Sequence, residues 1–201
     1  MLSYKESLKI LKETNALLEG HFILSSGLHS KQYIQCAKLL SQPKEAEKIC
    51  SSLCQKIAET FNDIDLVLSP AVGGIVVGFE VGRQLSKPTI FSERENGKLT
   101  LRRGFKIDKN SKVLIVEDVI TTGKSALECA KIVQENQSTV VGFACIIDRS
   151  NQNCLIKDKL VSQVKLEILT YESNKLPDDL KKIPPTKPGS RSLPKWKKEL
   201  V

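Results

Sequence analysis

The sequence predicts an α/β fold in which a doubly wound, mainly parallel sheet is flanked by helices. Three apolar runs, at 65–69, 112–116 and 139–147, are nearly continuous rather than alternating, as in strands that are buried on both faces. Helical stretches are expected between them, at about 74–85 and 124–135. Strand–helix–strand order of this kind favours a parallel sheet covered by helices.

The segments before these strands carry signals for both helices and strands. Leucines at a rough helical spacing predict a helix over 4–18. Two short strands are expected at 22–24 and 33–34, between turns marked by glycine and serine. A second amphipathic helix is predicted over 43–61, since the proline at its start suits a first turn.

Other elements are expected on either side of the 112–116 and 139–147 strands. The Asn-Gly pair at 96–97 is typical of a two-residue turn and predicts a hairpin or mobile loop between residues 91 and 105. A last strand is expected at 164–169 and a short helix at 176–183. The prolines beyond that helix exclude regular structure there.

Length and composition indicate one domain with an appendage. The chain has 201 residues, 40% of them apolar and 27% charged, which is ordinary for a globular protein. We expect a single domain over 1–174, with a small N-terminal hood over about 1–40 and a core over about 41–174, followed by a basic Pro/Lys-rich tail over 175–201. The longest apolar run, 71–79, is too short for a membrane span, and no signal peptide is recognisable, so a cytoplasmic location without a membrane partner is expected.

The chain has a net positive charge, and its basic residues are unevenly distributed along the sequence. Of the net charge of +8, the tail supplies +5 through eight basic and three acidic residues. Such a surface favours anions, but aromatic residues make up only 5% and no DNA-binding spacing is present, so no nucleic-acid partner is expected. A solvated, solubilising tail is the simpler interpretation. The 6 cysteines form no CxxC pair and the 2 histidines are not at metal-ligand spacing, which predicts reduced thiols and no metal site made by the protein.

The most informative stretch is VLIVEDVITTGKS, at 113–125. An apolar strand is expected to end in Glu117 and Asp118, and a Thr/Gly/Ser loop then opens a helix. Ligands of open α/β sheets bind at the carboxyl ends of strands, and free N–H groups at a helix start bind phosphate. A P-loop is excluded because position 118 is not glycine, and no GxGxxG fingerprint occurs.

Two carboxylates beside a phosphate site would repel the phosphate, so we expect them to bind something else. They could bind hydroxyls, a metal or a developing positive charge, and a ribose phosphate that loses its leaving group offers both hydroxyls and a cationic carbon. The alternative interpretation is that Asp118 caps the following helix and Glu117 meets a surface lysine.

The stretch at 113–125 resembles the phosphoribosyl-diphosphate-binding motif of the type I phosphoribosyltransferases. GHFILSSGLHSKQYIQ at 20–35 resembles the N-terminal hood of the orotate-using members of that family. SPAVGGI at 69–75 resembles their diphosphate-binding loop, and IIDRS at 146–150 resembles the strand end with their orotate-binding arginine. PTKPGSR at 185–191 resembles the tail of one bacterial subgroup.

The resemblance implies an activity and its partners. The reaction would transfer ribose 5-phosphate from 5-phospho-α-D-ribose 1-diphosphate to orotate, giving orotidine 5′-monophosphate and diphosphate in pyrimidine (UMP) biosynthesis. Mg²⁺ would be the cofactor, held mainly by the substrate. The enzyme would be a homodimer in which the loop at 93–104 reaches the neighbouring site and excludes water.

The resemblance also assigns roles to residues. Glu117 and Asp118 would hold the ribose hydroxyls and, with Lys98 and Arg94, act in catalysis, the cations facing the leaving diphosphate. Arg149 would pair with orotate, which Thr121 would also touch. The whole donor-binding set would be Arg94, Lys98, Glu117, Asp118, Val119, Ile120, Thr121, Thr122, Gly123, Lys124 and Ser125.

Two of these roles have structural alternatives. Arg149 could simply pair with Asp148, and the basic residues of the loop, including Arg102 and Arg103, could lie on an exposed hairpin.

The chain also departs from the family pattern. Many members have lysine where this chain has Ser25, and tyrosine-lysine where it has the pair at 72–73; the loop also lacks their histidine. Lys31 is a candidate substitute for the hood lysine, and His29 could reach the ligand from the hood.

Two other functions compete with this one. A purine phosphoribosyltransferase would share the motif at 113–125 but would not need Arg149 for a carboxylate. A ligand-sensing, nucleic-acid-binding regulator would explain the basic tail, but too few residues precede position 20 for a DNA-binding domain.

Overall fold

The structure is a computed structural model of the chain. No helix in the part of the chain that it describes is both long and apolar enough to cross a membrane. The described residues are 1–150, 152, 154–156 and 159–188.

The chain groups into two compact units. The larger consists of Met1–Ala16 and Cys36–Glu167, and the smaller of Leu17–Gln35 and Ile168–Val201. The domain boundaries expected from the sequence stay a prediction.

The larger unit is built on a six-stranded sheet with the order β5-β4-β3-β6-β7-β8. All neighbouring strands are parallel except β4 and β5, which form an antiparallel hairpin. The predicted doubly wound, mainly parallel sheet is therefore confirmed. The strands are β3 (Leu66–Pro70), β4 (Thr89–Glu95), β5 (Lys98–Leu101), β6 (Lys112–Ile120), β7 (Thr139–Asp148) and β8 (Leu160–Lys165).

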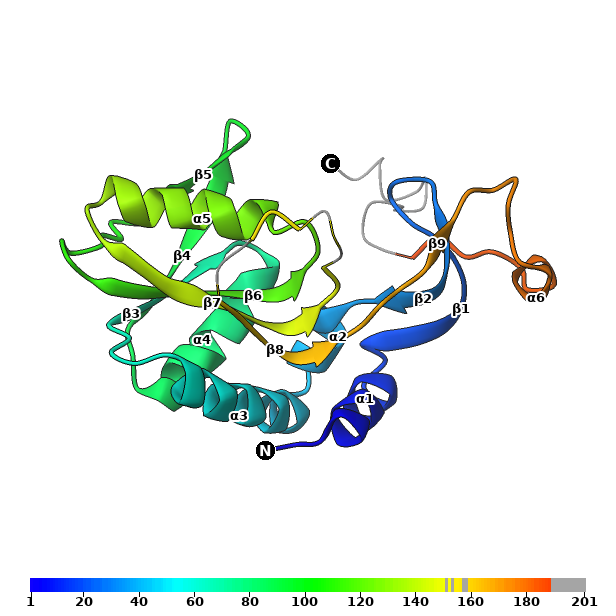
Figure 1. Cartoon of the computed structure of the whole chain (residues 1–201), viewed down its shortest axis with the longest axis horizontal. Helices are drawn as coiled ribbons and strands as arrows, with labels where there is room; N and C mark the ends of the chain where they lie inside the picture. Colours follow the sequence, from blue (N-terminus) through cyan, green and yellow to red (C-terminus); the bar gives the residue numbers. More distant parts are fainter. Residues whose placement is uncertain (151, 153, 157–158, 189–201) are drawn as a thin grey trace, which may run out of the picture. The chain divides into compact units, whose positions relative to one another are not determined.

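Helices cover both faces of this sheet. Figure 1 shows α5 on one face and α3 and α4 on the other. The helices in the described part of this unit are α1 (Tyr4–Glu13), α2 (Cys36–Leu40), α3 (Pro43–Thr60), α4 (Gly73–Leu85) and α5 (Lys124–Glu135).

The order of the strands places a switch point between β3 and β6. From β3 the chain continues to β4 on one side, whereas from β6 it continues to β7 on the other side. Helix α4 follows β3 and α5 follows β6, so both helices begin at the carboxyl ends of the two strands that flank this point. Open α/β sheets bind their ligands at such a position.

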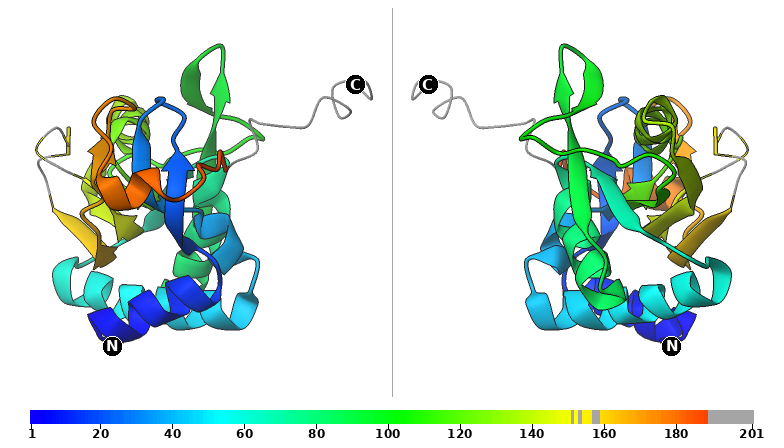
Figure 2. Two further views of the ribbon diagram at one scale, coloured as in Figure 1. Left: turned by 90° about the vertical axis from the view of Figure 1, so that its right-hand side faces the viewer. Right: turned by 90° about the vertical axis from the view of Figure 1, so that its left-hand side faces the viewer.

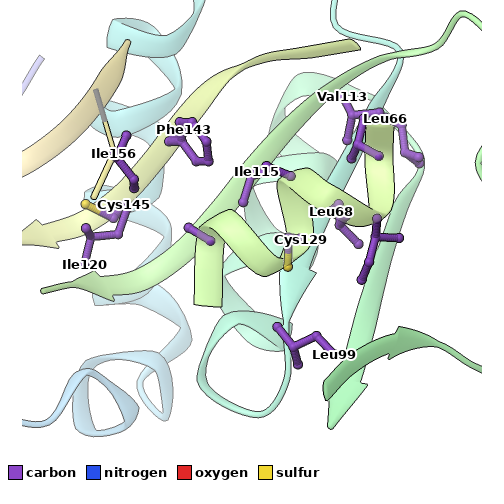
Figure 3. Close-up of a cluster of buried hydrophobic side chains, with 14 of the residues drawn as sticks. Leu66, Leu68, Leu99, Val113, Ile115, Ile120, Cys129, Phe143, Cys145 and Ile156 are labelled. Carbon is purple, nitrogen blue, oxygen red and sulfur yellow. The ribbon is translucent and has the colours of Figure 1, made fainter. Parts of the chain in front are cut away.

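The central strands have apolar, buried side chains on both faces of the sheet. Leu66, Leu68 and Ile115 pack in one core cluster with Cys129 of α5 (Figure 3). The intervening Val67 is fully buried as well. Since successive residues of a strand point to opposite faces, burial of both sets explains why the runs do not alternate.

The smaller unit contains a three-stranded antiparallel sheet, with the order β1-β2-β9. His21 and His29 are buried in it, 2.6 Å apart between Nε2 and Nδ1, and His21 Nδ1 also bonds the carbonyl of Ile183 at 2.7 Å. Its elements are β1 (Leu17–Ile23), β2 (His29–Ile34), β9 (Thr170–Tyr171) and α6 (Asp178–Lys181).

Several predicted elements have wrong bounds. The strands expected at 22–24 and 33–34 are longer, as Leu17–Ile23 and His29–Ile34, and the helix expected at 176–183 is shorter, as Asp178–Lys181. The helix expected over 4–18 ends at Glu13, because Asn15 adopts a left-handed φ of 57° and the leucines beyond it pair with β2. The strand expected at 164–169 is shifted, because the residues that pair with β7 are Leu160–Lys165.

Candidate active site

The two acids of the motif lie on β6 beyond the point where β3 leaves it. Pairing with β3 ends at Leu68 and Ile115, whereas pairing with β7 continues to Ile120 and Asp148. The strand therefore does not end at the acids, as the sequence suggested, because β7 still supports it there. On the β3 side, Glu117 and Asp118 have no strand opposite them.

Glu117 and Asp118 point to opposite faces of the sheet. Asp118 faces the start of α4, since a Cβ atom on Gly73 would lie 2.8 Å from its Oδ1. Glu117 faces the α5 side, where burial and then the Glu117 charge raise the pKa of Cys129 to about 12. One strand thus offers a carboxylate to each side of the switch point.

Both carboxyl groups are half-buried and hold protons more tightly than usual. Burial, followed by the charge of Asp118, raises the pKa of Glu117 to about 7. Burial also raises the pKa of Asp118, although the N–H groups of Val119 and of Asp118 itself oppose this effect. A cation or a developing positive charge beside these groups would offset the cost of their ionisation.

The structural alternatives for these acids are not realised. The N-cap of α5 is Gly123, which has no side-chain capping bond, so Asp118 does not cap this helix. Among the described residues Glu117 forms no ion pair.

The loop after β6 presents free donors at the start of α5. Gly123 has a φ of 77°, a left-handed conformation that favours glycine. The N–H groups of Thr121, Thr122 and Gly123 donate no hydrogen bond within the described part of the chain, and both threonines are exposed. Such N–H groups at a helix start can receive an anion.

The loop after β3 comes close to Asp118. Because a Cβ atom on Gly73 would lie 2.8 Å from Asp118 Oδ1, no side chain fits there unless Asp118 moves. The glycine thus lets the Asp118 carboxylate lie directly against the backbone at the start of α4. The sequence predicted a packing role for Gly74 of this segment but no contact between Gly73 and Asp118; the position of Gly73 just after a strand end was the available signal.

Most cations of the β4–β5 hairpin are already paired. Arg94 lies 3.0 Å from Glu128 of α5, Arg103 binds Glu93 at 2.8 Å, and Arg102 lies 3.8 Å from Glu95. Lys98, beside the Asn-Gly turn, is exposed and forms no ion pair with any residue that the structure describes. Figure 2 shows this hairpin, in green, extending past the other strands of its sheet.

Arg149 follows β7 at the same edge of the sheet as the acids of β6. Its side chain is half-buried, and burial lowers the pKa of its guanidinium. The alternative pairing with Asp148 is not found in the described residues. The Asp148 carboxylate instead accepts from the Ser150 N–H at 2.7 Å and lies 3.8 Å from Lys165.

Two candidates in the hood have partners within their own unit. Lys31 forms an ion pair with Asp179, and His29 is buried against His21. Neither residue is a free donor, so the structure offers no support for their suggested contact with the ligand.

The site contains no complete set of protein ligands for a metal. In the ranges that the structure describes, no group of three or more His, Cys, Asp or Glu side chains could hold a metal ion. Two carboxylates remain, which suits Mg²⁺ because it often binds one or two carboxylates together with substrate phosphates. The donor set therefore fits a magnesium ion that arrives with its substrate.

Comparisons with known proteins agree with this geometry. Residues 37–177 match the phosphoribosyl transferase domain. An orotate phosphoribosyltransferase of Methylorubrum populi is 47% identical over 192 residues, which cover 95% of this chain and 98% of that protein.

Solved structures share the fold. The orotate phosphoribosyltransferase of Aeropyrum pernix superposes with a TM-score of 0.69 at 27% identity, covering 79% of this chain and 93% of that one. The orotate phosphoribosyltransferase of Mycobacterium tuberculosis, in complex with inorganic phosphate, superposes with a TM-score of 0.64 at 20% identity. The match covers 80% of this chain and 95% of that one. At that lower identity the likeness concerns the fold alone.

Proposed function

The chain belongs to the orotate phosphoribosyltransferase family within the phosphoribosyl transferase domain, and on that premise we propose how its site carries out the reaction. It transfers ribose 5-phosphate from 5-phospho-α-D-ribose 1-diphosphate to orotate, giving orotidine 5′-monophosphate and diphosphate. The observation that supports this chemistry best is the pair of half-buried carboxylates on β6, directly before a loop of free N–H donors.

The ribosyl donor binds along β6 and the loop that follows it. The 5-phosphate accepts hydrogen bonds from the residues at 121–125, at the start of α5. Glu117 and Asp118 bind the ribose hydroxyls, and their charge stabilises the ribose carbon as it becomes cationic. Because the carboxylates are already in place, they need little reorientation in the transition state.

Magnesium binds with the substrate rather than in a separate protein cage. Glu117 and Asp118 are the residues that would hold it, directly or through water. When bound, the ion supplies positive charge to the diphosphate as this group leaves.

Lys98 is the loop cation best placed to serve the leaving group. Arg94, Arg102 and Arg103 would each have to leave an acidic partner first, whereas Lys98 has no such partner among the described residues. Arg94 is a second candidate, because its partner Glu128 lies on α5, just beyond the phosphate loop.

Arg149 binds orotate. Its half-buried guanidinium has no described ion pair, and a planar, forked donor fits a carboxylate or a pair of ring oxygens. Thr121 lies close to Arg149, since the Arg149 N–H donates to the carbonyl of Ile120, the residue before Thr121, at 2.8 Å.

The chain acts as a homodimer, and the occupant of the exposed face of α4 is a second copy. Val72, Val76 and Phe79 form an apolar stripe there, with Val72 exposed by 82% and Phe79 by 64%. The stripe continues from the loop beside Asp118, so a second copy on it would approach the site. This position supports the proposal that the loop at 93–104 serves the neighbouring subunit.

Absorbance-monitored turnover tests the function. We expect orotate to be consumed with the ribosyl donor when Mg²⁺ is present, and not when it is removed by a chelator. Adenine, guanine and xanthine in place of orotate should give no product. Reaction with purines alone would establish the purine alternative, and salt-sensitive binding of duplex DNA without turnover of any base would establish the regulator.

A further inference from the structure

Two carbonyls hold the phosphate loop (residues 121–125) to the segment that follows β7, one from the last residue of β6 and one from within the loop. The Arg149 N–H donates to the carbonyl of Ile120 at 2.8 Å, and the Leu155 N–H donates to the carbonyl of Thr122 at 2.9 Å. The two acceptors belong to alternate peptide groups of the loop. Both carbonyls therefore point toward the segment after β7.

The direction of each carbonyl fixes the direction of the next N–H group. In a planar trans peptide the C=O and the following N–H point in opposite directions. Within the described residues the cis bond is that between Ala71 and Val72, so the loop peptides are trans. The N–H groups of Thr121 and Gly123 thus point away from the segment after β7, and they have no described acceptor.

Ile156, the next residue of the same segment, also holds the loop by packing. A Cβ atom on Gly123 would lie 2.7 Å from Ile156 Cγ1, so this side chain is pressed against the glycine backbone. Ile156 is itself buried in the core cluster that includes Ile120 and Ala126 (Figure 3). The loop cannot shift toward the core without displacing Ile156.

We propose that Leu155, through its backbone N–H, and Ile156, through its side chain, are positioning residues for the 5-phosphate of the ribosyl donor. This inference rests on the proposed function, because it requires a phosphate on the free N–H groups of the loop. Neither residue touches the substrate. They hold the peptide planes so that the donors already face the anion, which removes the cost of turning them on binding.

Ile156→Ala tests the side chain, with Val133→Ala as its matched control. Val133 is fully buried in the same cluster but lies near the far end of α5. Both changes remove buried methyl groups and should lower the melting temperature. We expect only Ile156→Ala to raise the dissociation constant for ribose 5-phosphate and the KM for the ribosyl donor, by roughly tenfold, with the KM for orotate nearly unchanged. Ile156→Val should restore most of the affinity.

Leu155→Pro tests the hydrogen bond, compared with Leu155→Ala, in which the N–H remains. The Leu155 side chain is 55% exposed, so the two variants differ mainly in the donor. We expect proline to weaken ribose 5-phosphate binding several-fold more than alanine does.

Calorimetric titration with ribose 5-phosphate decides between the outcomes. Dissociation constants within twofold of the wild type in both Ile156→Ala and Leu155→Pro would overturn the positioning role, as would an equal rise in Val133→Ala. A wild-type protein that neither binds ribose 5-phosphate nor consumes orotate would overturn the proposed function itself.

Discussion

At the scale of single residues, the proposed reaction depends on two carboxylates, Glu117 and Asp118, that the fold keeps half-buried. They lie on one strand but face opposite sides of the sheet, and the burial of each raises its pKa. Sequence reasoning found both because acids directly after a buried apolar run are unusual. It could not find the contact of Gly73 with Asp118, because that contact joins residues far apart in the chain.

Asp118→Asn separates a chemical role from a structural one. We expect turnover to fall roughly 10²–10³-fold, since an amide cannot stabilise a cationic ribose carbon. The melting temperature should stay close to that of the wild type, because the neutral amide removes a buried charge. The measurements are orotate consumption and thermal unfolding.

Asp63→Asn is the matched control for this change. Asp63 pairs with Lys112 at the opposite end of β6, so its loss should leave turnover unchanged. A large fall in melting temperature with near-normal turnover in Asp118→Asn would assign this residue a structural role.

Glu117→Gln should alter how stability depends on pH. The folded-state pKa of Glu117 is about 7, above its ordinary value of 4.5, so ionisation costs the folded state stability as pH rises between these values. Relative to the wild type, the variant should gain roughly 1–3 kcal/mol by pH 8, with little gain at low pH. Urea unfolding from pH 5 to pH 8 measures this difference. A difference that stays constant over this range would mean that Glu117 titrates normally.

At the scale of elements, the sequence predicted the central strands and their helices well. The runs at 65–69, 112–116 and 139–147 are apolar throughout because both faces of the sheet are covered, and this pattern needs no tertiary information. The prediction of a two-residue Asn-Gly turn was also correct, since Asn96 and Gly97 both have positive φ, at 48° and 82°.

The errors fall where long-range pairing overrides the local pattern. Leucines at 17–18 continue a helical spacing, yet they pair with β2 across a turn. The bounds of β8 are set by its pairing with β7, which no local periodicity encodes. The sequence placed the loop cations together on one hairpin, and their part in the reaction stays a prediction. Their acidic partners, such as Glu128, were visible only in the structure.

Lys98→Ala tests whether Lys98 is the hairpin cation that faces the leaving diphosphate. We expect kcat to fall by roughly tenfold or more, because a charge that faces the departing diphosphate is lost. The KM for orotate should change little, and so should the stability, since Lys98 is exposed. Steady-state kinetics with both substrates measure the effect.

Lys131→Ala is the control for the loss of one exposed lysine. Lys131 lies on α5, where it pairs with Glu135. Equal kinetics for the two variants would remove Lys98 from the catalytic group.

At the scale of the whole molecule, the order of the strands explains where the site lies. The loops after β3 and β6 both begin at the carboxyl edge of the sheet, on either side of the switch point. The two acids lie on β6 near this edge, the loop at 121–125 follows β6, and Arg149 follows β7. The sequence alone could predict the fold class and this edge. It could not predict which residues a second copy would supply.

Mixing two defective subunits tests the homodimer. Asp118→Asn and Lys98→Ala impair different parts of the site, so a heterodimer with a shared site would regain one intact site. Random reassortment should then restore about a quarter of wild-type turnover. Activity no higher than the average of the two parent variants would mean that each site uses its own loop.

Phe79→Asp tests the proposed interface directly. A charge on the exposed stripe of α4 should shift the protein from dimer to monomer in light scattering coupled to size-exclusion chromatography. Tyr4→Asp, at an exposed aromatic residue on α1, is the control and should leave the mass unchanged.

The arrangement of donor and carboxylates is tested most directly by a crystal structure with 5-phospho-α-D-ribose 1-diphosphate and Mg²⁺ bound. We predict that the ribose hydroxyls lie within hydrogen-bond reach of Glu117 and Asp118, directly or through the ion or a water, and that the 5-phosphate lies on the N–H groups of residues 121–125. A donor bound elsewhere, with these groups free, would contradict the account.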